Sequence, residues 1–283
     1  MNQVLINLGC GGRFHRDWQN FDLYPSAPEV RQCDLAKGVP LPANYGDAVF
    51  NSALLEHLSP ATGRAFLLEC HRILKPGGIL RIGIPDMERI ARTYLNELER
   101  SVTGDRAAEA NYDWMMLELI DQMVRSRSGG AMGEAIKAGA PNEAFIEQRI
   151  GHEFTAMRAA FKAGDHGKLA RLRAMDPTER RHKVLRQLRQ IPGIIRRAIA
   201  GLFLSRADRA ALQLGRFRQS GEVHLWMYDR FSLARLMVQA GFREPRVKVA
   251  GQSDIPDWVR FGLDVDSTGA PIKPDLLYVE CLK

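Results

Sequence analysis

The segment 47–84 places one well-delimited helix between two apolar strands, and this order restricts the folds open to the chain. Asp47–Ala53 and Ile79–Ile84 are short apolar runs of strand length. Ser59 is positioned to cap a helix that starts at Pro60, and Pro76-Gly77-Gly78 ends the helical pattern. The apolar residues of this expected helix repeat at helical spacing: Phe66, Leu67, Cys70, Ile73 and Leu74. A strand, a helix and a strand in this order predict a parallel sheet of the nucleotide-binding kind.

Further strands and one late helix extend this pattern toward both ends. The remaining strands are expected at Val4–Leu8, at Asn20–Leu23, ending near Cys33, at Arg246–Ala250 and at Leu276–Leu282. Asp229 or Ser232 can cap a helix that ends at Gly241. Its inward residues are expected to be Leu233, Leu236 and Met237.

The stretch between these two parts shows long helical patterns without strands. Breaks are expected at 126–133 and 164–167, and Asn142–Ala163 is predicted to be one amphipathic helix. The chain has 283 residues, 45% of them apolar and 26% charged, which excludes a disordered protein and fits one large domain. We therefore expect a core formed by 1–96 and 221–283, with residues 97–220 as a helical insertion.

The cysteines and the chain start argue against several protein classes. The four cysteines, at 10, 33, 70 and 281, form no CxxC pair and are too sparse for a disulfide scaffold, so neither a metal site nor a disulfide framework is expected. Met1–Asn7 lacks the basic start of a secretory signal, and no stretch of about 18 uncharged apolar residues suggests a membrane span. A cytoplasmic location is the expectation.

The net charge of +7 is concentrated in one segment. Residues 176–218 carry eleven lysines and arginines against three acids, so the rest of the chain is nearly neutral. Within it, 179–204 mixes arginines with bulky apolar residues, which fits either a solvated basic face or peripheral attachment to an anionic membrane. Nucleic acid is disfavoured because aromatic residues are sparse there and no recognition motif accompanies the charge. The sequence does not define an oligomeric state.

A glycine-rich loop, Asn7–Arg13, follows directly after the first expected strand. Glycines there allow a tight turn and let a ligand approach main-chain N–H groups. A dinucleotide-binding fingerprint would need a third glycine where Phe14 stands and an acid about 20 residues later. The next acid, Asp22, comes too early for that arrangement.

Several motifs in a fixed order resemble those of class I S-adenosylmethionine-dependent methyltransferases, most closely the type 11 branch. The fragments are Asn7–Gly12, Asn20–Asp22, Cys33–Leu35, Asp47–Phe50, Leu55–Leu58, Leu74–Gly78 and Ile84–Asp86. The resemblance covers 4–95 and, less closely, 221–282. It implies an α/β, Rossmann-like, mostly parallel sheet of seven strands whose last strand is antiparallel, with S-adenosylmethionine as cofactor. Members of this branch often act on polysaccharides or lipid-linked glycans.

The resemblance also assigns the cofactor contacts by position. The loop residues would pass under the methionine moiety and the ribose, Asp22 would bind the ribose hydroxyls, and Asp34 would bind the adenine amino group. The full set is Gly9, Cys10, Gly11, Gly12, Asp22, Asp34, Leu35, Asn51, Ser52 and His57. Two departures stand out: Asn7 replaces the usual acid before the first glycine, and the link between the first two strands is too short for a normal helix.

Methyl transfer from a sulfonium needs alignment and exclusion of water more than catalytic side chains. If the acceptor is a hydroxyl, a general base should lie beyond the carboxyl ends of the fourth and fifth strands. Asp86 and His224 meet this positional requirement. Asp86 fits a helix cap equally well, and His152 is more consistent with a solvated helix face. Trp226 and Tyr228 fit either core packing or an acceptor pocket.

The sequence therefore predicts an S-adenosylmethionine-dependent methyltransferase that O-methylates a glycan or lipid-linked sugar. Two alternatives remain open at this point. One is an enzyme that uses NAD or a nucleotide sugar on the same type of core. The other is a non-catalytic membrane-associated protein built on a degenerate methyltransferase core.

Overall fold

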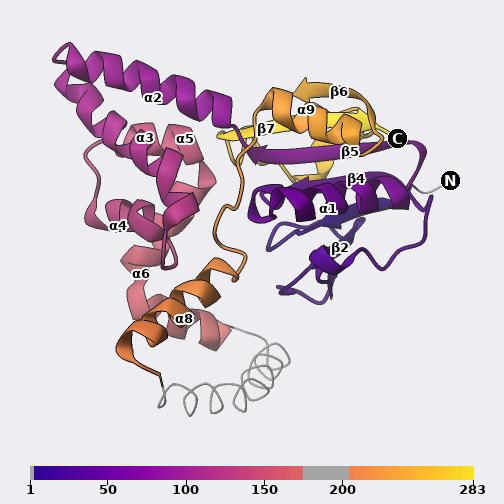
Figure 1. Cartoon of the computed structure of the whole chain (residues 1–283), viewed down its shortest axis with the longest axis horizontal. Helices are drawn as coiled ribbons and strands as arrows, with labels where there is room; N and C mark the ends of the chain where they lie inside the picture. The colour runs from indigo at the N-terminus through magenta and orange to yellow at the C-terminus, as the bar shows by residue number, and fades with distance from the viewer. Residues whose placement is uncertain (1–2, 175–203) are drawn as a thin grey trace.

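A mostly parallel, seven-stranded sheet forms the centre of the structure, a computed structural model that describes residues 3–174 and 204–283 (Figure 1). Its strand order is β3-β2-β1-β4-β5-β7-β6. The strands are β1 (Leu5–Leu8), β2 (Gln19–Asp22), β3 (Val30–Gln32), β4 (Gly46–Ser52), β5 (Leu74–Pro85), β6 (Arg243–Lys248) and β7 (Leu276–Leu282). Strands β1 to β5 are mutually parallel, whereas β7 is antiparallel to both β5 and β6. The predicted fold class is confirmed.

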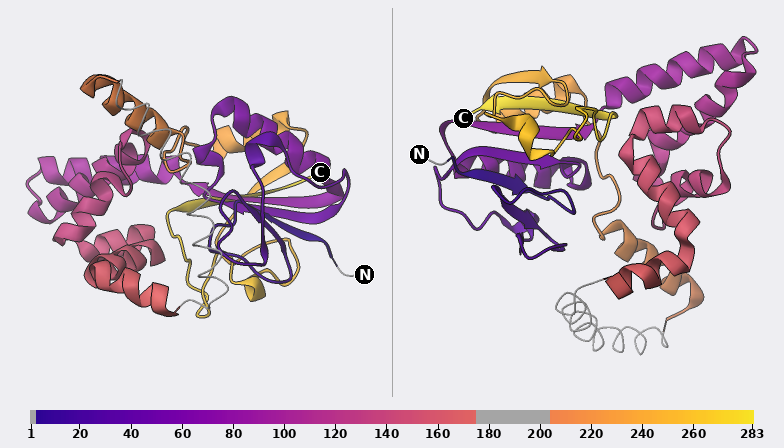
Figure 2. Two further views of the ribbon diagram at one scale, coloured as in Figure 1. Left: turned by 90° about the horizontal axis from the view of Figure 1, so that it is seen from below. Right: turned by 180° about the vertical axis from the view of Figure 1, so that it is seen from behind.

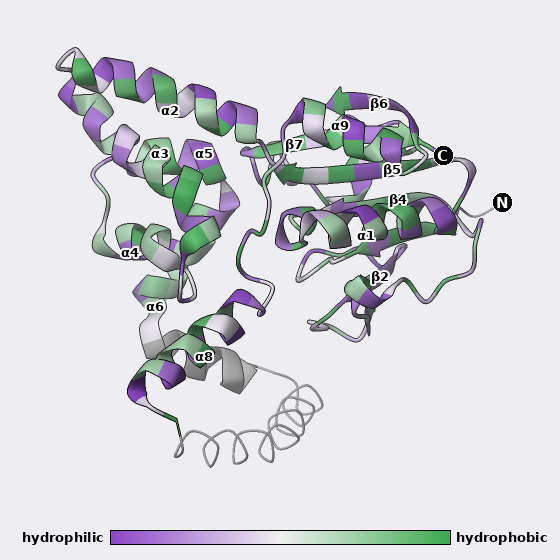
Figure 3. Ribbon diagram, viewed as in Figure 1, coloured by the Kyte–Doolittle hydropathy of each residue, from purple (hydrophilic) through white to green (hydrophobic). Residues whose placement is uncertain are grey.

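One face of the sheet is covered by helices α1 (Pro60–Ile73) and α9 (Arg230–Gln239). The Ser59 side chain accepts the N–H of Thr62 with Pro60 at the first helical position, so α1 begins as the sequence predicts. Asp229 and Ser232 cap α9 reciprocally in a capping box. The apolar stripes of both helices are buried against alternate residues of β1, β4 and β5. Figure 3 shows the largely hydrophobic colour of β4 and β5.

The opposite face is covered mainly by loops. Trp18, the 3-10 helix η3 (Trp258–Phe261) and neighbouring residues pack on Phe50 of β4. Arg81 of β5 lies fully buried in this layer, where it pairs with Asp264 and Glu280. The pair with Asp264 therefore connects β5 to the loop that follows β6.

A group of helices lies beyond the carboxyl ends of β4 and β5 and is connected to the sheet by α2 (Figures 1 and 2). The helices are α2 (Met87–Val102), α3 (Arg106–Val124), α4 (Gly130–Ala138), α5 (Glu143–Ile150), α6 (His152–Ala174) and α8 (Arg206–Arg218). Trp114, Met115, Ile146 and Phe154 contribute to a separate core within this group. The helices thus have a hydrophobic core of their own beside the sheet.

The single helix predicted over Asn142–Ala163 is wrong, because the chain breaks at Gly151 into α5 and α6. Gly151 has a φ of 56°, and a Cβ there would lie 2.7 Å from the carbonyl oxygen of Ile272. The N–H of His152 donates to the same carbonyl, at 3.1 Å. A contact with a distant loop therefore ends the helix, although the apolar spacing continues past it. At Gly164, where a break was expected, α6 is kinked.

Most of the basic segment 179–204 lies outside the described residues, and so does the membrane contact predicted for it. Within the part of the chain that the structure describes, no helix combines the length and apolar character needed to cross a bilayer.

Candidate functional site

The glycine loop after β1 forms one wall of a cavity of about 440 Å³ at the carboxyl edge of the sheet. Gly9 and Gly11 have φ values of 69° and 54°, conformations that favour glycine. The N–H groups of Gly9 and Cys10 both donate to the carbonyl of Phe21, which ties the loop to β2. The residues lining the cavity are Asn7, Gly9, Cys10, Gly11, Gly12, Arg13, Phe50, Ser52, Ala53, Leu263, Asp264, Ile272, Lys273 and Tyr278. This volume is within the range of small-molecule sites.

The two acids assigned to the cofactor serve the backbone in this structure. The Asp22 carboxylate accepts the N–H groups of Gly11 and Tyr24, each at 2.8 Å, and so braces the glycine loop. Each of its oxygens retains a free lone pair. Asp34 caps a 3-10 helix (Leu35–Lys37), and the hydrogen bond from Lys37 lowers the pKa of its carboxyl. Neither acid belongs to the cavity wall.

Asn51 and Ser52, the adjacent residues at the end of β4, face opposite sides of the sheet. Ser52 lines the cavity beside the glycine loop. Asn51 is fully buried on the side of α1, and its amide has no hydrogen-bond partner among the described residues. Of these two predicted contacts, the structure brings only Ser52 next to the glycine loop.

A second cavity, of about 490 Å³, adjoins the first one on the side of the helical group. Its lining comes from the end of β4, from helices α3 to α6 and from segments near 222 and 275. The lining residues are Ala53, Glu56, His57, Pro85, Gln122, Arg125, Gly129, Met132, Ile150, Glu153, Met157, Ser220, Gly221, Glu222, His224, Lys273, Asp275 and Leu276. Ala53 and Lys273 line both cavities. Ala53 has a φ of 51°, so a strained backbone conformation lies where the cavities meet.

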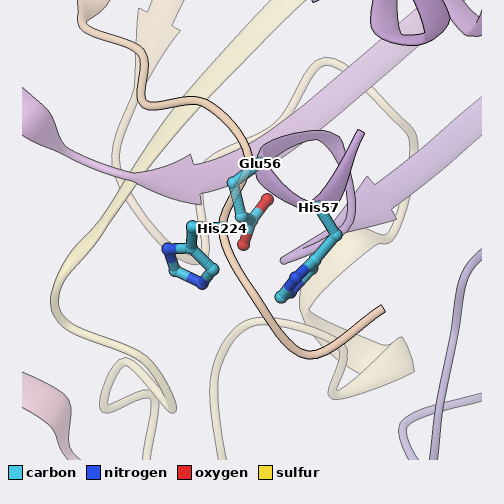
Figure 4. Close-up of side chains that lie close together, drawn as sticks. All are labelled: Glu56, His57 and His224. Atoms are coloured by element: carbon cyan, nitrogen blue, oxygen red, sulfur yellow. The ribbon is translucent and has the colours of Figure 1, made fainter. Parts of the chain in front are cut away.

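Three polar side chains, Glu56, His57 and His224, converge in the second cavity (Figure 4). The backbone N–H of Leu225 donates to the carbonyl of Glu56 at 2.7 Å, which joins the segment after β4 to the segment before α9. The two imidazole rings are 4.8 Å apart between centroids, edge to face. His57 Nδ1 lies 3.2 Å from the carbonyl of Val223. With Nδ1–H donating there, Nε2 keeps its lone pair.

Burial determines the charge of these three groups. It raises the pKa of Glu56 to about 8. It lowers the pKa of His224 to about 2, with His57 adding a smaller effect, and it also lowers the pKa of His57. Both imidazoles are therefore neutral near pH 7. Neither carboxylate oxygen of Glu56, nor Nδ1 of His224, has a hydrogen-bond partner among the described residues.

The other predicted candidates lie outside this cluster. Asp86 caps α2 by accepting the N–H of Arg89 at 3.1 Å, and it lines neither cavity. His152 is half exposed, with Nε2 at 3.1 Å from a carboxylate oxygen of Asp266. Trp226 is 47% exposed, and Tyr228 is buried in the core that lies under α1. Of the two proposed bases, only His224 faces a cavity.

The structure adds site residues that the sequence patterns did not indicate. Lys273, between the two cavities, pairs with Glu153 at 3.3 Å. Burial raises the pKa of Asp275 to about 6. Both residues precede β7, and a polar pair directly before a buried strand was the only signal for them.

Residues 14–82 match the family model described as a methyltransferase domain. Over this segment the chain is similar to the type 11 methyltransferase family. The match confirms the predicted resemblance to class I S-adenosylmethionine-dependent methyltransferases, and the sheet order agrees with it. Among the curated proteins, no sequence matches this chain.

Solved structures of methyltransferases are similar to this chain at low sequence identity. One, from Mesorhizobium loti, is 18% identical over 30% of this chain and 48% of its own, with a TM-score of 0.24. The 1,6-didemethyltoxoflavin-N1-methyltransferase from Burkholderia thailandensis is 20% identical over 30% and 45%, with a TM-score of 0.25. One from Archaeoglobus fulgidus is 12% identical over 99% and 86%, with a TM-score of 0.37. The alignment spans about half the length of the first two.

Proposed function

We propose that this protein transfers a methyl group from S-adenosylmethionine to a hydroxyl group of a glycan or lipid-linked sugar. The observation that carries the proposal is the pair of adjoining cavities at the carboxyl edge of the sheet, which share Ala53 and Lys273. A donor in one and an acceptor in the other would meet at this junction. Such alignment, with water excluded, is the main requirement of methyl transfer.

The cavity beside the glycine loop suits the cofactor. A Cβ at Gly11 would meet no atom within 4 Å, so the loop leaves open space at this position. The main chain of Gly9 to Gly12 and the side chain of Ser52 would hold the methionine and ribose moieties. Bound there, the cofactor supplies an activated methyl group on its sulfonium. The chain then has to orient the acceptor oxygen and exclude water.

The second cavity suits a hydroxyl-rich acceptor. Gln122, Arg125, Glu222 and Asp275 line it together with the backbone of two glycines, so hydrogen-bonding groups surround the space. His224, rather than Asp86, would face the acceptor oxygen, since Asp86 is engaged in capping α2. In this proposal the helical insertion, residues 97–220, supplies much of the acceptor wall, and the sheet supplies the donor site.

Calorimetric titration of the full-length protein tests the donor half of the proposal. S-adenosylhomocysteine and S-adenosylmethionine should bind with one site per chain, whereas NAD should give no heat. Gly11→Ala should weaken this binding by about tenfold or more, because the added methyl occupies cofactor space. Gly77→Ala is the matched control, since Gly77 also has a positive φ and open surroundings but lies at the far end of β5. Equal affinity in both variants would contradict the assignment.

Mass spectrometry tests the acceptor half. The protein is incubated with methyl-labelled cofactor and fractionated cell-envelope extracts, and label is sought in sugars released from glycans and lipids. We expect labelled O-methyl sugar. Label found only in protein, nucleic acid or a small nitrogenous metabolite would refute the acceptor class and leave the donor assignment standing.

A further inference from the structure

The second cavity contains a polar cluster that hydrogen bonding within the protein leaves incomplete. Glu56 is 1% exposed, yet neither carboxylate oxygen has a partner among the described residues. His224 is 5% exposed, and its Nδ1 is also unpartnered. A buried polar group without a partner costs free energy, and a buried charge costs more. An arrangement that places both groups beside a second histidine therefore suggests a ligand that all three can bind.

We propose that Glu56, His57 and His224 bind a divalent first-row transition-metal ion, of which Zn²⁺ is the best match. One possible ligand atom from each residue lies within 4.8 Å of the other two. Two imidazoles and one carboxylate form the donor set of catalytic zinc and non-haem iron sites. Mg²⁺ and Ca²⁺ prefer oxygen ligands and fit this set poorly.

The surroundings of His57 match those of a metal-binding histidine. Its Nδ1 lies 3.2 Å from the carbonyl of Val223, so Nε2 is the nitrogen left with a free lone pair. Metal-bound histidines commonly donate their other ring N–H to a backbone carbonyl in this way, which fixes the ring orientation. Val223 precedes His224 directly, so the segment that carries one ligand also orients another.

The backbone positions the ligands before any ion is present. The N–H of His224 donates to the carbonyl of Gln122 at 2.9 Å, and the N–H groups of Leu225 and Trp226 both donate to the carbonyl of Glu56. Figure 4 shows the carboxylate of Glu56 extending into the space between the two rings. Ligand atoms around Zn²⁺ lie about 3.3 Å apart, given bond lengths of about 2.0–2.2 Å. Small rotations of the three side chains would therefore close the site.

The charge balance nearby is compatible with a cation. Two basic residues line the cavity, and each is already paired: Lys273 with Glu153 at 3.3 Å and Arg125 with Glu222 at 3.5 Å. Asp275, in the same wall, has one carboxylate oxygen without a hydrogen-bond partner in the part of the chain that the structure describes. A metal ion would provide the positive charge that neutralises the buried carboxylate of Glu56.

The proposed role of the ion rests on the proposed function, whereas its binding does not. The three protein ligands leave coordination positions open toward the acceptor cavity. An acceptor hydroxyl could fill one of them and be held by its oxygen next to the junction at Ala53. Glu56, His57 and His224 would thus bind the acceptor oxygen indirectly, through the metal ion.

Zinc binding is measured on tag-free, full-length protein treated with a chelator and desalted. Titration with ZnCl₂ should show one site per chain with a Kd below about 1 µM. His57→Asn and His224→Asn should each weaken binding by at least about 100-fold, because each removes a direct ligand. His71→Asn is the control, since His71 lies in the last turn of α1, packed against Phe242, and should bind Zn²⁺ as the wild type does.

Co²⁺ bound to the wild-type protein gives an independent measurement that needs no variant. The visible absorption of a four- or five-coordinate site with nitrogen ligands is expected. Absence of micromolar Zn²⁺ binding, equal affinity in all three histidine variants, or a Co²⁺ spectrum of an oxygen-only, six-coordinate ion would overturn the inference. Titration of the metal-free protein with S-adenosylhomocysteine distinguishes the two proposals. The protein can bind this compound without binding Zn²⁺, and it can bind Zn²⁺ without binding this compound.

Discussion

Arg81→Met should destabilise the protein severely, because Arg81 neutralises two buried carboxylates. The guanidinium is fully buried, 2.7 Å from Glu280 and also paired with Asp264. It lies between the rings of Trp258 and Tyr278, 4.7 Å from each centroid. Removing one partner of a buried ion pair typically costs about 3–5 kcal/mol. Both carboxylates retain other donors, including Trp258 Nε1 on Asp264, so we expect about 4 kcal/mol.

This loss is a large share of the roughly 5–15 kcal/mol that stabilises a typical protein. Urea unfolding followed by circular dichroism measures it, with Arg246→Met as the control on an exposed part of the same sheet. Among the described residues Arg246 pairs with Glu244 alone, at the surface, so its loss should cost less than about 1 kcal/mol. Equal midpoints for the two variants would refute the reasoning. Because Asp264 also lines the cavity proposed for the cofactor, Arg81→Met should in addition weaken cofactor binding.

Three further predictions concern capping, pH and backbone strain. Ser59→Ala removes the acceptor for the N–H of Thr62 and should cost about 1 kcal/mol in urea unfolding. Burial disfavours the Asp47 carboxylate, but hydrogen bonds from Lys75 and from Val4 N–H outweigh it and lower its pKa. The ionised Asp47 therefore stabilises the folded protein above its ordinary pKa near 3.8, and this contribution is lost as the pH falls through the lower pKa of the folded state. The stability of Asp47→Asn should therefore approach that of the wild type in acid. Ala53→Gly should raise the free energy of unfolding by up to about 1 kcal/mol and lower the turnover rate. Asn44→Gly, which also has a positive φ but lies away from both cavities, should leave the turnover rate unchanged.

The local signals that predicted the fold correctly are those in which neighbouring residues determine the structure. The bounds of α1 follow from Ser59 and Pro60 at one end and the Pro-Gly-Gly sequence at the other, and α1 ends at Ile73, one residue before the last predicted apolar contact. Strand β7 spans Leu276–Leu282 as predicted, because a continuous apolar run in a buried strand has no competing pattern.

Long-range contacts explain what the sequence did not predict. The break at Gly151 depends on the carbonyl of Ile272, more than a hundred residues away. The sequence is consistent with Asp86 either as a helix cap or as a general base. Only the three-dimensional structure shows that its carboxylate accepts the N–H of Arg89. Glu56 and His224 are also more than a hundred residues apart in the sequence, so no spacing rule could bring them together.

The division of the site between sheet and helices leads to a last expectation about acceptor choice. The proposed donor cavity is built mainly from the ends of β1 and β4 and the segment before β7, whereas much of the wall of the proposed acceptor cavity comes from α3 to α6. Substitutions in the helical wall, such as Gln122→Ala or Met157→Ala, should therefore change acceptor affinity without changing the affinity for S-adenosylhomocysteine. Ala53 and Lys273 belong to both walls, so changes there should affect both. A helical-wall variant that loses cofactor affinity while still fully folded would contradict this division.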